Sequence, residues 1–196
     1  MAKGPPFHFG PLATYRNGPV SSNVRLNMTD SDPYRLLGQI IITFQHLEDC
    51  INEIIHLLVQ AKDEEMSRIL VNELDNSARL KTVDVLFQRF TSVRTGSFEK
   101  ENKGFHKLVS ELQNLGTRRN EIVHSKYFNW TSADGEEGLL RQNSKLRSSK
   151  GMREELEEEL LPKELWEDLR KLNNAYGKLD SYRLKIIDWL HPVEPA

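Results

Sequence analysis

The stretch PYRLLGQIIITFQHLEDCINEIIHLLV, residues 33 to 59, decides the fold class of this chain. Its apolar residues recur every three or four positions, which places them on one face of an α-helix. At about 3.6 residues per turn, this stripe continues for roughly eight turns. Its members are Leu36, Ile40, Phe44, Leu47, Ile51, Ile54 and Leu58. Pro33 suits a first helical position and Ser31 or Asp32 can cap it, so a long helix is predicted to begin here.

Further helices are predicted along the rest of the chain. A short one is expected around EEMSRILVNEL, another from Asn76 or Ser77 onward, and a fourth from about Phe98 into RRNEIVH. The segment REELEEELLPKELWEDL predicts that a helix restarts, breaks at Pro162 and continues to Trp189. Apolar residues at helical spacing support each of these elements.

The segment 129–151 separates the fourth helix from the last one. Its Asp134-Gly135 pair is typical of a tight turn, so a short β-hairpin or a loop is predicted there. The predicted fold class is all-α, a bundle of about five helices with this insertion before the last helix. The bundle is expected to form one domain over residues 30–196. Prolines and glycines are concentrated before it, which indicates an N-terminal arm over residues 1–29.

The composition limits the function classes. A net charge of -2 excludes a strongly basic global field, so any nucleic-acid contact needs a local patch. The single cysteine, Cys50, excludes an internal disulfide framework and fits a reducing compartment, so a cytoplasmic location is predicted. No apolar run reaches about 18 residues, so no membrane contact is expected. No phosphate-binding glycine loop and no H-E-x-x-H motif occurs, so neither a cofactor nor a metal site is expected.

The end of the predicted fourth helix carries polar residues beside its apolar stripe. Placed on a helical wheel, the core face holds Phe105, Leu108, Leu112, Leu115, Ile122 and Val123. Arg119 falls in the middle of this face, where a guanidinium must either reach solvent or find polar partners. Asn120 and His124 are four residues apart on the adjacent flank and therefore lie on one side of the helix. Gly116, one turn earlier, leaves room for a close neighbour.

Spacing alone does not separate function from chance at this stretch. A single histidine near a helix end is more often a cap or a surface residue than a catalyst. An arginine that interrupts an otherwise intact apolar stripe, however, favours a functional role, because local rules are broken mainly at functional sites.

The stretch RNEIVH, residues 119 to 124, resembles the R-polar-x3-4-H signature of the HEPN superfamily (higher eukaryotes and prokaryotes nucleotide-binding). The resemblance covers about residues 33–190, because the long first helix and the motif near the end of a later helix also agree. It implies a helical bundle that dimerises and cleaves RNA without a metal, as a toxin or an antiviral-defence effector. It also implies that Arg119, Asn120 and His124 are catalytic, and that an antitoxin or a nucleotidyltransferase can be a partner.

These three residue types suit RNA cleavage. RNA supplies its own nucleophile, the 2′-hydroxyl, and a histidine can move protons near neutral pH. The arginine matches charge that develops on the phosphorus centre, and the asparagine can orient either group. One histidine per chain is little for both acid and base, so we expect a homodimer that joins two copies of Arg119 and His124 in one cleft.

A basic run follows the motif helix and predicts RNA contacts. The residues predicted to bind RNA are Arg118, directly before the motif, and Arg141, Lys145, Arg147 and Lys150 of the run. They could hold phosphates at the edge of the cleft. A solvated loop is the alternative interpretation of this run.

Two alternatives to an RNA-cleaving enzyme stay open from the sequence. One is a non-catalytic HEPN-like module, in which the same residues form a polar binding or dimerisation interface. The other is a helical scaffold with a chance motif. The presence of all three motif residues favours the enzyme.

Overall fold

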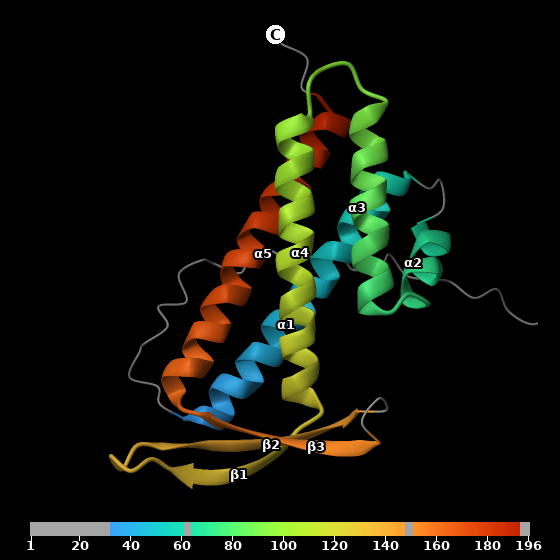
Figure 1. Cartoon of the computed structure of the whole chain (residues 1–196). Helices are drawn as coiled ribbons and strands as arrows, with labels where there is room; N and C mark the ends of the chain where they lie inside the picture. The colour runs from blue at the N-terminus through green and yellow to red at the C-terminus, as the bar shows by residue number, and fades with distance from the viewer. Residues whose placement is uncertain (1–31, 61–63, 148–150, 193–196) are drawn as a thin grey trace, which may run out of the picture. The chain divides into compact units, whose positions relative to one another are not determined.

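The computed structural model describes residues 32–60, 64–147 and 151–192. The predicted N-terminal arm, residues 1–29, lies outside the described residues. The described elements all belong to one unit of the chain, Ser31–Ala196. In order they are α1 (Pro33–Val59), α2 (Glu64–Asn72), α3 (Asn76–Ser92), α4 (Glu99–Val123), β1 (Lys126–Thr131), β2 (Glu137–Arg147), β3 (Met152–Leu160) and α5 (Pro162–Leu190) (Figure 1).

The helix starts follow from local chemistry. Asp32 caps α1, where its carboxylate accepts the N–H of Tyr34 at 3.0 Å, and Pro33 takes the first helical position. Asp75 caps α3 in the same way and accepts the N–H of Ala78 at 2.7 Å. The helices predicted over residues 33–59, around residues 64–74 and from Asn76 or Ser77 onward are confirmed.

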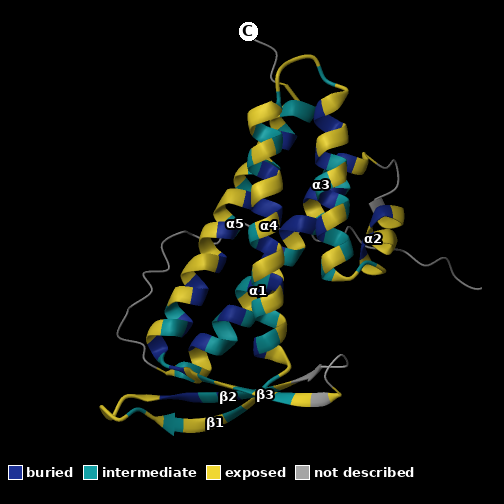
Figure 2. Ribbon diagram, in the orientation of Figure 1, coloured by how far each residue is buried: buried dark blue, intermediate teal, exposed yellow. Residues whose placement is uncertain are grey.

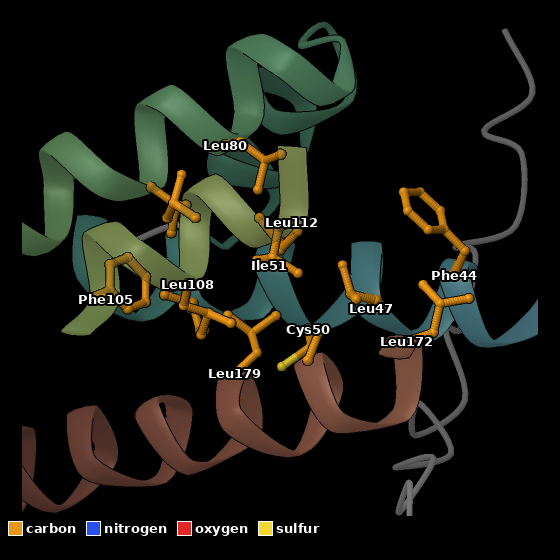
Figure 3. Packing of buried hydrophobic residues seen from close by; sticks show 14 of the residues in the cluster. Phe44, Leu47, Cys50, Ile51, Leu80, Phe105, Leu108, Leu112, Leu172 and Leu179 are labelled. Atoms are coloured by element: carbon orange, nitrogen blue, oxygen red, sulfur yellow. The ribbon is translucent and has the colours of Figure 1, made fainter. Parts of the chain in front are cut away.

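The apolar stripe of α1 forms the centre of the core. Figure 3 shows side chains from α1, α3, α4 and α5 that meet there. They include Phe44, Leu47, Cys50 and Ile51 from α1, Leu80 from α3, Phe105, Leu108 and Leu112 from α4, and Leu172 and Leu179 from α5. Each such side chain, when fully buried, contributes roughly 1.5–3 kcal/mol. Figure 2 shows the same division along the helices, with buried faces turned inward and exposed faces outward.

An antiparallel sheet follows α4 and precedes α5 in the chain, and it lies across one end of the helices (Figure 1). The fold is therefore mostly helical rather than all-α. The strand order of the sheet is β1-β2-β3. The turn expected at Asp134-Gly135 joins β1 to β2, and Gly135 has a φ of 83°, a left-handed conformation that glycine adopts without strain. The predicted insertion is thus larger than 129–151, because strands extend from Lys126 to Leu160.

The helix predicted from Arg153 onward is wrong, because that segment forms β3. Leu156 and Leu160 are four residues apart, a spacing that fits both a helix and alternate positions of a strand. Pairing with β2 decides between the two. Leu160 lies opposite Leu139, and both are fully buried. Pro162 does not break a helix but begins α5 at its first position.

Candidate functional site

The motif residues Asn120 and His124 lie on an exposed side of α4 at its C-terminal end. Both are exposed to solvent. His124 is the C-cap residue, and its N–H donates to the carbonyl of Asn120 at 3.0 Å. The helical spacing therefore places the two side chains on one side, as predicted, with the imidazole accessible to a ligand.

Arg119 lies at the border between this exposed side and the core. Its guanidinium carbon is 5.5 Å from the centre of the Phe44 ring, within the range of a cation–π interaction. Its Nη1 donates to Asn120 Oδ1 at 3.1 Å. Its Nε is buried and has no hydrogen-bond partner among the described residues. The arginine thus packs its stem inward, while one end of its guanidinium is held by the neighbouring asparagine.

Gly116 allows α3 to approach α4 one turn before the motif. The glycine is buried, and a Cβ at this position would collide with the Nδ2 of Asn76, the first residue of α3. The ring of Phe44 is next to the same point. The room predicted at Gly116 is therefore filled by Asn76, whose Oδ1 is buried without a hydrogen-bond partner in the described structure.

Arg118, adjacent to Arg119 in sequence, has a different environment. Its Nε donates to Asp168 Oδ2 of α5 at 2.8 Å, and its Nη1 donates to Glu158 Oε2 of β3 at 2.8 Å. Burial by itself disfavours its charge, but the two carboxylates outweigh burial and raise the pKa of the guanidinium. Arg118 therefore joins the motif helix to the sheet and to the last helix.

Arg141 shares Glu158 with Arg118. Its Nε donates to Glu158 Oε2 at 2.7 Å, and its side chain is only 8% exposed. Burial opposes ionisation of Glu158, but the hydrogen bonds and charges of the two arginines dominate and lower the pKa of that carboxyl. We call Arg118, Arg141, Glu158 and Asp168 the ion-pair network. Sequence reasoning missed Glu158 because the helix predicted for the β3 segment hid its pairing with Arg141. It missed Asp168 because that residue meets Arg118 only through the packing of α5 on α4.

The other basic residues predicted to bind RNA are Lys145, Arg147 and Lys150. Lys145 and Arg147 belong to β2, opposite Glu154 and Met152 of β3. Lys150 lies outside the described residues. RNA contacts by the five predicted basic residues stay a prediction, and for Arg118 and Arg141 the guanidinium groups are already engaged by carboxylates.

An open groove of about 660 Å³ lies between α4 and α5, on the Arg118 side of the motif helix. Its charged lining is formed by Glu111, Arg118, Glu158, Glu164, Glu167, Asp168, Lys171 and Lys178. Carboxylates outnumber cations there, and Lys178 is paired with Glu111 at 2.8 Å. A phosphate backbone is repelled by such a surface, so this groove does not suit RNA.

The described residues give little support to a metal site, to a cysteine nucleophile or to a membrane-spanning helix. No group of three or more His, Cys, Asp or Glu side chains is arranged there to hold a metal ion. Cys50 is buried, and burial together with Asp180 raises the pKa of its thiol to about 12, so it is not a nucleophile at neutral pH. Of the helices in the described residues, none combines the length and the apolar character of a membrane span.

Comparison of the chain with protein-family models, with curated proteins and with solved structures finds no match. The assignment of a function therefore depends on the motif and its geometry.

Proposed function

We propose that this protein is an endoribonuclease of the HEPN type, with Arg119, Asn120 and His124 as its catalytic residues. One observation carries the proposal. Of two adjacent arginines, Arg118 is bound by two carboxylates, whereas Arg119 has no carboxylate partner among the described residues and lies beside an exposed histidine. This separation leaves one guanidinium available to a phosphate.

The proposed reaction is an internal transesterification of RNA. A histidine takes the proton of a 2′-hydroxyl, the 2′-oxygen attacks the adjacent phosphorus, and the bond to the 5′-oxygen breaks. The leaving 5′-oxygen takes a proton, which yields a 2′,3′-cyclic phosphate and a 5′-hydroxyl. Arg119 stabilises the charge on the phosphorus centre, and Asn120 holds the arginine through its bond to Nη1.

We also propose a homodimer with a composite site. Each chain offers one histidine at the motif, while the reaction needs both a base and an acid. A two-fold axis near His124 brings the second histidine from the other copy. A role as a toxin or antiviral-defence effector, with an antitoxin or nucleotidyltransferase partner, follows from the resemblance alone.

A second candidate function is a non-catalytic binding or dimerisation module. The bond between Arg119 and Asn120 favours it, because the same contact can serve as a polar seam between two copies. The two candidate functions predict different effects of a His124 substitution on RNA cleavage.

The deciding experiment compares His124→Ala with His46→Ala on a labelled single-stranded RNA. His46 is an exposed histidine on α1 and serves as the matched control. We expect His124→Ala to lose cleavage by at least about 100-fold and His46→Ala to keep it, since removing a general acid or base costs roughly that factor or more. Equal cleavage by both variants contradicts the enzyme and favours the binding module.

End-group analysis of the products tests the chemistry separately. Cyclic phosphate ends formed in the presence of EDTA agree with attack by the 2′-hydroxyl. Products that carry 5′-phosphate and form only with added magnesium contradict it.

A further inference from the structure

The C-terminal end of α4 is held by side chains of the sheet. A helix leaves its last carbonyl groups without partners inside the helix, and these must find donors elsewhere. The Arg141 Nη1 donates to the carbonyl of Glu121 at 3.1 Å, and the Tyr127 hydroxyl donates to the carbonyl of Ile122 at 2.6 Å. The Ser125 hydroxyl also donates to the carbonyl of Glu121. The turn that ends in His124 is thus fixed by donors from β1 and β2.

The two donors from the sheet form one structural unit. Tyr127 of β1 and Arg141 of β2 are direct partners in the antiparallel register, and their side chains therefore point to the same face of the sheet. That face meets the helix end, and the pair donates to two consecutive carbonyls. A cation at a helix C-terminus is additionally favoured by the helix dipole. Glu158 holds the Arg141 guanidinium in place from the other side.

Arg141 is fully occupied by these contacts. Its Nε and Nη2 are bonded to Glu158 at 2.7 Å, and its Nη1 reaches the Glu121 carbonyl and the Ser125 hydroxyl. With a side chain that is 8% exposed, it presents no nitrogen to a phosphate without breaking one of these bonds. These contacts favour a structural role for Arg141 over the RNA contact that the sequence predicted.

We infer that Arg141 and Tyr127 are positioning residues, which hold the backbone at His124 in place relative to Arg119. The inference rests on the proposed function for its catalytic consequence. His124 lies between the two anchored carbonyls and the first residue of β1, and its own N–H is bonded to Asn120. A shift of the His124 backbone relative to Arg119 therefore requires at least one of these bonds to break. Misplacement of a catalytic group by about 1 Å can lower the rate by about 100-fold.

The test uses a pair of tyrosine variants of the full chain. Tyr127→Phe removes only the hydroxyl that donates to Ile122. Tyr182→Phe is the matched control, because its hydroxyl also donates to an α4 carbonyl, that of Glu101 at 3.4 Å, but at the opposite end of the helix. For each, we measure amide hydrogen exchange at residues 121–126, single-turnover cleavage, and the Kd for the same RNA with 2′-O-methyl groups throughout.

We expect Tyr127→Phe to raise amide exchange at the end of α4 and to slow cleavage, each by about tenfold, the effect of one lost hydrogen bond. The Kd should change by less than about twofold, and Tyr182→Phe should change none of the three by more than that. Unchanged exchange at residues 121–126 in Tyr127→Phe overturns the inference. An unchanged cleavage rate alongside raised exchange overturns its catalytic part.

Arg141→Gln distinguishes positioning from phosphate binding. Glutamine removes the charge and also lacks the planar fork that joins Glu158 to the helix end. We expect slower cleavage with an unchanged dependence of Kd on salt. A decrease of about one in the slope of log Kd against log salt concentration assigns Arg141 to a phosphate and overturns the inference. If the wild-type chain does not cleave RNA, the proposed function fails, and the exchange measurement alone still decides whether the sheet fixes the helix end.

Discussion

The two sides of the last turns of α4 each carry an arginine, and the contacts of these two arginines differ. On one side, Arg118 reaches the groove between α4 and α5 and is bound by Glu158 and Asp168. On the other, Arg119 packs against the Phe44 ring and donates to Asn120, next to solvent. The residues are adjacent in sequence, but about 100° separates them around the helix. The charge of Arg118 is therefore paired within the fold, whereas Arg119 has no carboxylate partner among the described residues.

This difference predicts that substitutions on the Arg118 side mainly lower stability, whereas substitutions on the Arg119 side mainly lower RNA cleavage. The ion-pair network should carry the stability of the sheet and its junction with α4. The side with Arg119, Asn120 and His124 should carry RNA cleavage and little stability.

The largest effect is expected for Glu158→Leu, which removes the close carboxylate partner of the buried Arg141 and leaves it the more distant Glu121, at 3.9 Å. Removing one partner of such a pair destabilises a protein by about 3 kcal/mol. Glu157→Leu is the control, because Glu157 is the exposed neighbour on the opposite face of β3 and should change stability by less than about 0.5 kcal/mol. Urea unfolding measures both. Equal destabilisation by the two variants contradicts a role for the network.

A smaller loss is expected for Arg118→Met. The methionine keeps part of the packed stem, but Asp168, with a side chain that is 12% exposed, then retains Lys171, at 3.5 Å, as its one cationic partner among the described residues. We expect a loss of about 1 to 2 kcal/mol in the free energy of unfolding, the range for a buried group that loses its partner. Cleavage measured well below the melting temperature should persist. If Arg118→Met instead abolishes cleavage at unchanged stability, the assignments of the two arginines must be exchanged.

Lowering the pH should reduce the stability that the ion-pair network contributes. The pKa of Glu158 in the folded chain is lower than in the unfolded chain, so its contribution to stability is present above the ordinary glutamate pKa of about 4.3. That contribution is lost as the pH falls through the lower, folded value. We therefore expect Glu158→Gln to show a shallower loss of stability than the wild type below about pH 4.3. Parallel pH profiles of the free energy of unfolding count against this linkage.

The smallest stability effects are expected on the exposed side. Asn120→Ala and Arg119→Met should each change the free energy of unfolding by less than about 1 kcal/mol, since they remove an exposed bond and keep the packed stem on Phe44. Their cleavage rates should nevertheless fall, with the larger loss for Arg119→Met. Thermal melting and cleavage assays on the same preparations make the comparison. A loss of cleavage that only follows the loss of stability would falsify the separation of the two sides.

The helical part of the fold could be predicted from the sequence because its signals are local. The stripe from Leu36 to Leu58 and the caps at Asp32 and Pro33 specify α1 without reference to any other segment. The motif could also be placed, because residues four apart on a helix share a side whatever surrounds them. For this reason Asn120 and His124 lie together on the exposed flank as expected.

The sheet and the ion-pair network were decided only by tertiary structure. The segment MREELEEEL has a spacing that fits either a helix or a strand, and it becomes a strand because β2 offers Leu139 and Arg141 opposite Leu160 and Glu158. That pairing joins residues far apart in sequence, which no local pattern reports. The different environments of Arg118 and Arg119 arise in the same way. The sequence by itself determined that two arginines stand at the end of α4, and only the packing of the sheet and α5 decided which of them is bound by carboxylates.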